Sequence, residues 1–162
     1  MNTIKHFTIR VYAIIINDAK KEVLLSDEFQ LGMNMTKFPG GGLEFGEGTI
    51  ECLKREAIEE FGQEIEVLEH FYTTDFFQQA MFKNEYQVVS IYYLAKFIDE
   101  IKFKISDKAF DFKELKNESQ SFRWQAIEKL KINDLTLPID QKVAKMLISG
   151  YKKTSITALR KS

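Results

Sequence analysis

Three glutamates stand close together in the sequence, at Glu56, Glu59 and Glu60. If this stretch is helical, a rotation of about 100° per residue turns Glu60 about 40° to one side of Glu56 and Glu59 about 60° to the other, so the three carboxylates share one face. Like charges at this spacing repel by about 0.2 to 0.5 kcal/mol a pair. Carboxylates are also the ligands that Mg²⁺ prefers, with water and phosphate oxygens in its remaining positions. The spacing therefore indicates a divalent-metal site that could assist attack on phosphorus.

A glycine-rich stretch precedes these acids at residues 38–42, where Phe38 and Pro39 are followed by three glycines. Proline ends a strand, and glycine permits backbone shapes that other residues resist, so we expect a loop here. Its main chain could approach a phosphate or lend a carbonyl to a metal. An acidic helix alone is more often a solvated surface with salt bridges, and the loop is what favours the chemical interpretation.

The stretch between Thr49 and Phe61 is predicted to be helical, because Ile50, Leu53 and Ala57 recur at helical spacing with Phe61. Gly62 follows where a left-handed residue would close a helix. Arg55 lies on the flank of the acidic face, four residues from both Glu51 and Glu59. We expect it to hold Glu59 in place.

The rest of the chain alternates predicted strands and helices. Strands are expected at residues 7–16, 23–25, 65–77, 86–97 and 122–124, and a helix is expected from Pro138 to Gly150. The strands at 65–77 and 86–97 should pair antiparallel across a polar link. The predicted architecture is a mixed sheet flanked by helices, in one domain over residues 1–150, with a mobile basic tail over 151–162.

Composition limits the classes of partner. The 162 residues include 23 Lys and Arg against 24 Asp and Glu, so no basic field is present to attract nucleic acid polymers, and a small-molecule substrate fits better. The single cysteine, Cys52, excludes an internal disulfide framework and favours the cytoplasm. We expect neither a signal peptide nor a membrane span.

Residues 41–63 resemble the Nudix box in the type and spacing of seven fixed residues. These are Gly41, Glu47, Arg55, Glu56, Glu59, Glu60 and Gly62. Gln63 replaces the final apolar residue of the box, Gly48 stands where Ser or Thr often caps the helix, and Thr36 stands where many members have tryptophan. None of these departures changes an expected metal ligand.

The resemblance implies an α/β/α sandwich of the Nudix type and hydrolysis of a nucleoside diphosphate linked to another moiety, with Mg²⁺ as cofactor and Mn²⁺ as a substitute. Glu56, Glu59 and Glu60 are then expected metal ligands together with the Gly40 carbonyl. Arg55 and Glu47 would orient them. Many members recruit another acid shortly before a tryptophan near the last strand.

Glu118, six residues before Trp124, is the candidate for that further acid, although it is equally well explained as one acid of a solvated loop. Either Glu59 or Glu118 could act as the general base. The substrate could be a nucleoside triphosphate, a nucleotide sugar, ADP-ribose or a dinucleotide.

Two other functions remain open at this point. A Nudix-fold module could bind a nucleotide or sugar nucleotide without cleaving it, but such modules usually lose acids of the box, and this chain keeps them. A structural protein whose acidic helix meets a basic partner would need no glycine loop. The aromatic strands between residues 71 and 97 could supply a homodimer surface as well as a core.

Overall fold

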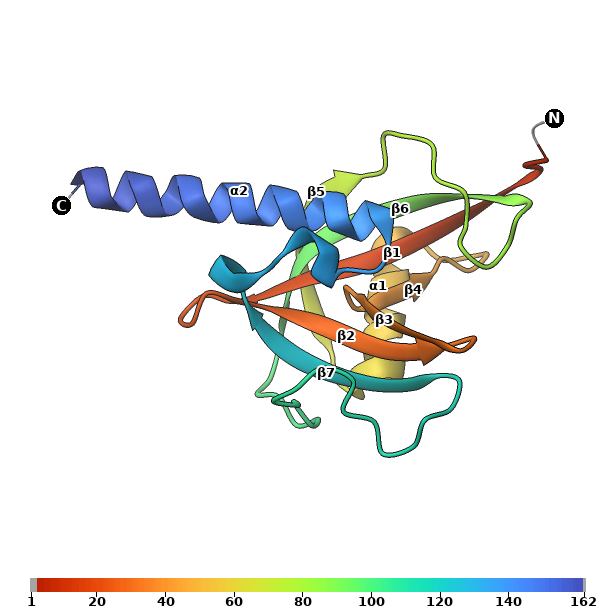
Figure 1. Ribbon diagram of the computed structural model, residues 1–162, viewed down its shortest axis with the longest axis horizontal. Helices are drawn as coiled ribbons and strands as arrows, with labels where there is room; N and C mark the ends of the chain where they lie inside the picture. Colours follow the sequence, from red (N-terminus) through yellow and green to blue (C-terminus); the bar gives the residue numbers. More distant parts are fainter. Residues whose placement is uncertain (1–2, 162) are drawn as a thin grey trace. The chain divides into compact units, whose positions relative to one another are not determined.

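The computed structural model describes residues 3–161, and side chains up to residue 153. The chain divides into two compact units, and Figure 1 labels their helices and strands. The first unit contains the chain up to Ile16 and Phe38–Phe103, and the second contains Asn17–Lys37 and the chain from Lys104 onward. No helix in the described residues combines the length and apolar character that a membrane span needs.

The first unit is a four-stranded mixed arrangement. Strand β1 (His6–Asn17) pairs parallel with β6 (Tyr86–Phe97), and β6 pairs antiparallel with β5 (Ile65–Thr73). The short strand β4 (Gly40–Gly42) pairs antiparallel with β1. The β-branched and aromatic residues that predicted β1, β5 and β6 thus form strands, and the predicted antiparallel pair is confirmed.

Strand β5 is shorter than predicted, because it ends at Thr73 and not at residue 77. The next residue, Thr74, bonds back to β6: its main-chain N–H donates to the Ser90 carbonyl over 3.0 Å, and its hydroxyl accepts from the Ser90 N–H over 2.8 Å. These bonds turn the chain before the apolar run ends. A pattern of apolar residues alone did not reveal them.

The glycines predicted to form a loop are a strand in the structure. On one side of β4 the Ala13 N–H donates to the Pro39 carbonyl over 2.8 Å, and on the other the Leu43 N–H donates to the Ile9 carbonyl over 2.9 Å. Glycine weakens a strand, and it marks places where another group must approach the backbone closely. The pairing with β1 therefore fixes a segment that looks flexible in the sequence.

Helix α1 (Thr49–Phe61) has the predicted bounds. The Glu51 carboxylate accepts the N–H of Gly48, which caps the start of the helix without a side chain of its own. Gly62 has φ 65° and donates its N–H to the Ile58 carbonyl over 2.9 Å, so it closes the helix in the left-handed conformation. The helix buries Leu53 and Phe61 and contacts β4 and β5.

The second unit contains an antiparallel arrangement in which β2 (Glu22–Gln30) lies between β3 (Met33–Lys37) and β7 (Ser119–Ala126). A fully buried carboxylate at Asp27 joins all three strands. It accepts the Thr36 hydroxyl over 2.6 Å and the Arg123 Nε over 2.7 Å. Strand β3 was not predicted, because its polar residues are typical of a loop. Their burial depends on hydrogen-bond partners from other strands, which the local sequence does not show.

The last helix, α2 (Pro138–Lys161), follows the short 3₁₀ turns η1 (Ile127–Lys129) and η2 (Ile132–Asp134). It starts at the predicted proline, but the predicted end at Gly150 is wrong. A glycine inside a helix costs about 1 kcal/mol relative to alanine, and without a following proline it does not stop the helix. The mobility predicted for the tail concerns residues whose side chains lie mostly outside the described part.

Together, the described residues form seven strands and two α-helices, an α/β fold with a mixed sheet, as predicted. The aromatic core is also present: Tyr12 and Tyr92 are buried and stack at a centroid distance of 5.2 Å. Phe38 is buried and meets Tyr92 edge-on. One domain over residues 1–150 stays a prediction.

Candidate active site

The outer edge of β4 forms one wall of the site. Pro39 and Leu43, the residues just before and just after β4, form main-chain hydrogen bonds with β1. Because main-chain groups alternate in direction along a strand, the N–H and carbonyl groups of Gly40 and Gly42 point away from β1. The Gly40 N–H donates to Glu60 Oε2 over 3.1 Å, and the Gly42 carbonyl accepts from Arg55 Nη2 over 3.0 Å. Gly40 has φ 145°, and a Cβ there would lie 2.1 Å from the Val11 carbonyl, so only glycine fits.

Arg55 is the hub of the site. Its Nε and Nη2 donate to the two oxygens of Glu47 over 3.0 and 2.7 Å, a bidentate pair. Its Nη1 lies 3.1 Å from Glu56 Oε1 and 3.2 Å from both oxygens of Glu59. The contact predicted between Arg55 and Glu59 is therefore confirmed, whereas Glu51 turns back to cap α1.

The three predicted metal ligands share a helix face but differ in burial. The Glu56 side chain is 14% exposed and lies against Gly41, where an added Cβ would come within 2.1 Å of Glu56 Oε1. Glu60 is half-buried against Gly40, and the Glu59 side chain is 56% exposed. Glu59 is thus the carboxylate with the most freedom to reach another group.

Arg55 changes the electrostatic argument made from the sequence. A dication was expected to offset the repulsion among the acids, but one guanidinium is already shared by Glu47, Glu56 and Glu59. In the described part of the chain, no three His, Cys, Asp or Glu side chains are arranged so that they could hold a metal ion without moving. Metal binding at this helix therefore stays a prediction.

Glu47 is strongly perturbed by its neighbours. Hydrogen bonds from Arg55 and from the Glu44 main-chain N–H lower its pKa from the ordinary 4.5 to about 2. A carboxyl whose pKa is depressed by folding stabilises the fold above pH 4.5 and loses that contribution as the pH falls through about 2.

We therefore expect Glu47→Gln to be less stable than the wild type above pH 4.5, with a difference that disappears near pH 2. Urea unfolding of both proteins at several pH values checks this. A stability difference that is the same at pH 7 and at pH 2.5 would contradict the assigned pKa.

Cys52 is buried beside this network, one turn before Glu56. Burial first, and then the hydrogen bond to Glu47, raise the pKa of its thiol to about 12. The thiol is protonated at neutral pH and is a poor nucleophile. Cys52 therefore contributes packing.

Glu118 belongs to the second unit, in the turn before β7. It is exposed, has φ 70°, and donates its main-chain N–H to the Phe29 carbonyl over 2.9 Å. The acids of α1 all belong to the first unit. A role for Glu118 in the site stays a prediction.

Gly41→Ala should disturb catalysis more than folding. The new methyl group would displace the Glu56 carboxylate, the far end of a flexible side chain, so the fold can adapt while the carboxylate cannot keep its position. We expect kcat to fall about tenfold, the equivalent of roughly 1.4 kcal/mol. The matched control is Gly48→Ala, whose Cβ would lie 2.7 Å from Glu51 Oε2 outside the cluster. Equal kcat values for the two variants would contradict the placement of Glu56.

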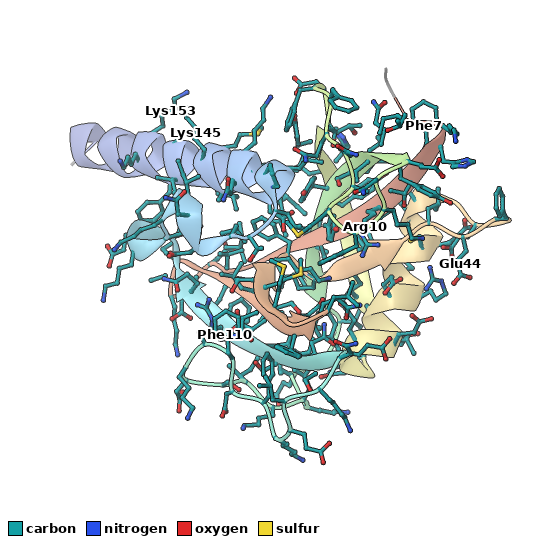
Figure 2. The ribbon with its side chains drawn as sticks, turned by 45° about the vertical axis from the view of Figure 1, so that its right-hand side comes forward. Phe7, Arg10, Glu44, Phe110, Lys145 and Lys153 are labelled. Carbon is teal, nitrogen blue, oxygen red and sulfur yellow. The ribbon has the colours of Figure 1, made fainter. Side chains whose placement is uncertain are left out.

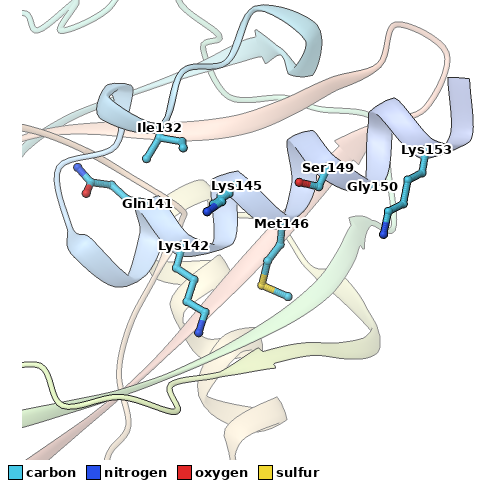
Figure 3. A pocket seen from close by; sticks show the side chains of 8 residues that line it. All are labelled: Ile132, Gln141, Lys142, Lys145, Met146, Ser149, Gly150 and Lys153. Carbon is cyan, nitrogen blue, oxygen red and sulfur yellow. The ribbon is translucent and has the colours of Figure 1, made fainter. Parts of the chain in front are cut away.

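One open groove is lined by other residues. In the second unit an open groove of about 820 Å³ follows one side of α2 (Figure 3). Ile132, Met146 and three lysines, Lys142, Lys145 and Lys153, are among the residues that line it. It contains none of the predicted site residues, and we assign it no part in the chemistry.

Comparison with known proteins agrees with the fold and with the spacing of the acids. The Nudix domain profile matches residues 6–147. The chain therefore belongs to the Nudix family, and by family it is a pyrophosphohydrolase. A search of curated proteins found no match.

Solved structures share the fold at low sequence identity. A Nudix hydrolase from Nitrosomonas europaea has a TM-score of 0.63 and 18% identity, covering 91% of this chain and 89% of that one. A MutT protein from Methanosarcina mazei has a TM-score of 0.62 and 22% identity, covering 91% and 97%. An ADP-ribose pyrophosphatase from Streptococcus suis has a TM-score of 0.55 and 16% identity, covering 86% of each chain.

Proposed function

We propose that this protein hydrolyses the pyrophosphate bond of a nucleoside diphosphate linked to another moiety, with Mg²⁺ or Mn²⁺ as cofactor. One observation carries the proposal: the outward-facing edge of β4 lies against the acidic face of α1, joined to it through Gly40 with Glu60 and Gly42 with Arg55. The alternative is a Nudix-fold module that binds such a nucleotide without cleaving it.

The donor set fits a hard dication. Glu56, Glu59 and Glu60 would hold it together with the Gly40 carbonyl, which lies on the same strand edge as the N–H bound to Glu60. Because Glu59 is the most exposed of the three, its carboxylate has room to move toward a metal when its contacts with Arg55 are exchanged for metal ligation. When bound, the metal would neutralise charge on the pyrophosphate oxygens and lower the pKa of the attacking water.

The protein's own residues have distinct tasks in this proposal. Glu47 fixes Arg55, and Arg55 fixes Glu56 and Glu59 on the acidic face. Glu59 accepts the proton of the attacking water, because it is the most exposed of the three carboxylates. Glu118 is the second candidate for this base.

The composition of the chain supports a proposal on its substrate, compartment and partners. We propose a small nucleotide-type substrate, action in the cytoplasm and no nucleic acid polymer as partner, supported by the near-zero net charge and the single buried thiol. A homodimer through the aromatic strands of the first unit is part of this proposal.

A panel assay tests the function. The protein is incubated with Mg²⁺ or Mn²⁺ and with ADP-ribose, nucleotide sugars, dinucleotide polyphosphates and nucleoside triphosphates, and again with EDTA. We expect turnover of at least one class, abolished by EDTA. Saturable binding without product under every metal condition would favour the binding module.

A further inference from the structure

Two rows of residues cross the first unit on the sheet face opposite α1. One row consists of Tyr72, Tyr92, Tyr12 and Gly40, and the next consists of Ser90, Arg10 and Gly42. The Cα of Gly41, between the two glycines, faces Glu56 of α1. Because successive residues of a strand point to opposite faces, the two rows face away from α1.

Arg10 is the only charged residue in these two rows, and it is held firmly. Its Nε donates to the Tyr12 hydroxyl over 2.8 Å, and its guanidinium carbon lies 5.7 Å from the centre of the Tyr12 ring. Tyr12 is itself 1% exposed and stacked on Tyr92, so the platform under the guanidinium is rigid. Little side-chain entropy would be lost if Arg10 bound an anion.

The Arg10 side chain lies beside β4 (Figure 2). A Cβ added to Gly42 would be 3.8 Å from Arg10 Nη1, so this donor stands just above the Gly42 Cα on the face opposite α1. The Gly42 carbonyl, on the outer edge of the strand, accepts from Arg55. The bare glycine strand is therefore flanked by carboxylates on one face and by a guanidinium on the other.

We infer that Arg10 is a substrate-positioning residue that binds phosphate oxygens of the pyrophosphate on the side turned away from α1. This rests on the proposed function. A pyrophosphate lying along the outer edge of β4 carries negative oxygens toward both faces of the strand. The carboxylate-bound metal could neutralise only those on the α1 side, whereas a planar guanidinium matches the geometry of phosphate oxygens on the other.

A purely structural role makes a different prediction. If Arg10 serves only to clamp Tyr12, its removal should lower stability and leave substrate affinity unchanged. If Arg10 binds phosphate, its removal should raise KM and leave kcat nearly unchanged, because the acids of α1 stay in place. The split between KM and kcat therefore separates the two roles.

The test compares Arg10→Met and Arg10→Lys with the wild type, and uses Lys96→Met as a matched control, because Lys96 pairs with Glu66 on the exposed surface. For Arg10→Met we expect KM to rise about 10- to 100-fold, the loss of one or two charge-assisted hydrogen bonds, with kcat within about threefold. Arg10→Lys should recover only part of the affinity, since lysine keeps the positive charge but lacks the planar guanidinium that can bind two phosphate oxygens. Lys96→Met should match the wild type.

Calorimetric titration with a non-hydrolysable methylene analogue of each substrate class in the panel separates this inference from the proposed function. If the wild type binds an analogue without turning over any substrate, the proposed hydrolysis fails, and weaker binding by Arg10→Met would still support the inference. A KM or an analogue affinity of Arg10→Met within twofold of the wild type would overturn it. So would a wild type that binds none of these analogues.

Discussion

Glu59→Gln and Glu60→Gln are each expected to lower kcat by about 100- to 1000-fold, the equivalent of roughly 3 to 4 kcal/mol in the barrier. Glutamine keeps the shape of the side chain and removes the charge on which metal ligation depends. For Glu59 the same change also removes the proposed base, so its deficit should be at least as large as that of Glu60. Steady-state turnover of the best substrate of the panel, at saturating Mg²⁺, measures both.

The control for these variants is Glu66→Gln, which neutralises an exposed acid on β5 that pairs with Lys96. Its turnover should equal that of the wild type. Excess Mn²⁺ should restore part of the activity of Glu60→Gln if the deficit lies in metal affinity. A fall of less than tenfold in both Glu59→Gln and Glu60→Gln would rule out the proposed cluster.

The helix that carries the acids could be predicted because all of its determinants are local. Leu53, Ala57 and Phe61 give it one apolar face, and Gly62 closes it. Its bounds follow from these residues alone. The contact between Arg55 and Glu59 was predictable for the same reason, since residues four apart on a helix are neighbours.

The wall opposite the helix was not predictable, because it depends on main-chain pairing between distant segments. Gly40 and Gly42 carry no side chain that could indicate a strand, and only their pairing with β1 turns their polar groups outward. Arg10 was missed for a related reason. Nothing in its local sequence places it beside Gly42, and the register between β1 and β4 does.

The full set of contacts that Arg55 makes also could not be predicted from residue spacing. Helical spacing connects it to Glu59, but its bidentate pair with Glu47 depends on the path of the loop before the helix. That loop is fixed by the Glu44 N–H, which donates to Glu47 Oε1 over 2.9 Å. The Arg55 side chain thereby links the loop, β4 and α1, and its removal should lower both the stability and the turnover of the protein.

Arg55→Met is accordingly expected to lower the free energy of unfolding by about 1 to 3 kcal/mol at pH 7, the range for lost hydrogen bonds between charged groups. The same variant should lose about 100-fold in kcat, because Glu56 and Glu59 are no longer held and repel each other. Arg55→Lys should be intermediate, since one ammonium cannot contact Glu47, Glu56 and the Gly42 carbonyl together. Urea unfolding and steady-state kinetics measure the two effects.

The pH dependence of stability tests whether Arg55 acts through Glu47. Because the hydrogen bond from Arg55 is the largest cause that lowers the pKa of Glu47, Arg55→Met should lose less stability than the wild type as the pH falls from 4.5 to about 2. Lys96→Met, which breaks an exposed pair with Glu66 elsewhere in the chain, should keep the wild-type loss. An Arg55→Met variant with wild-type turnover, or with an unchanged acid profile, would show that the carboxylates keep their positions by some other means.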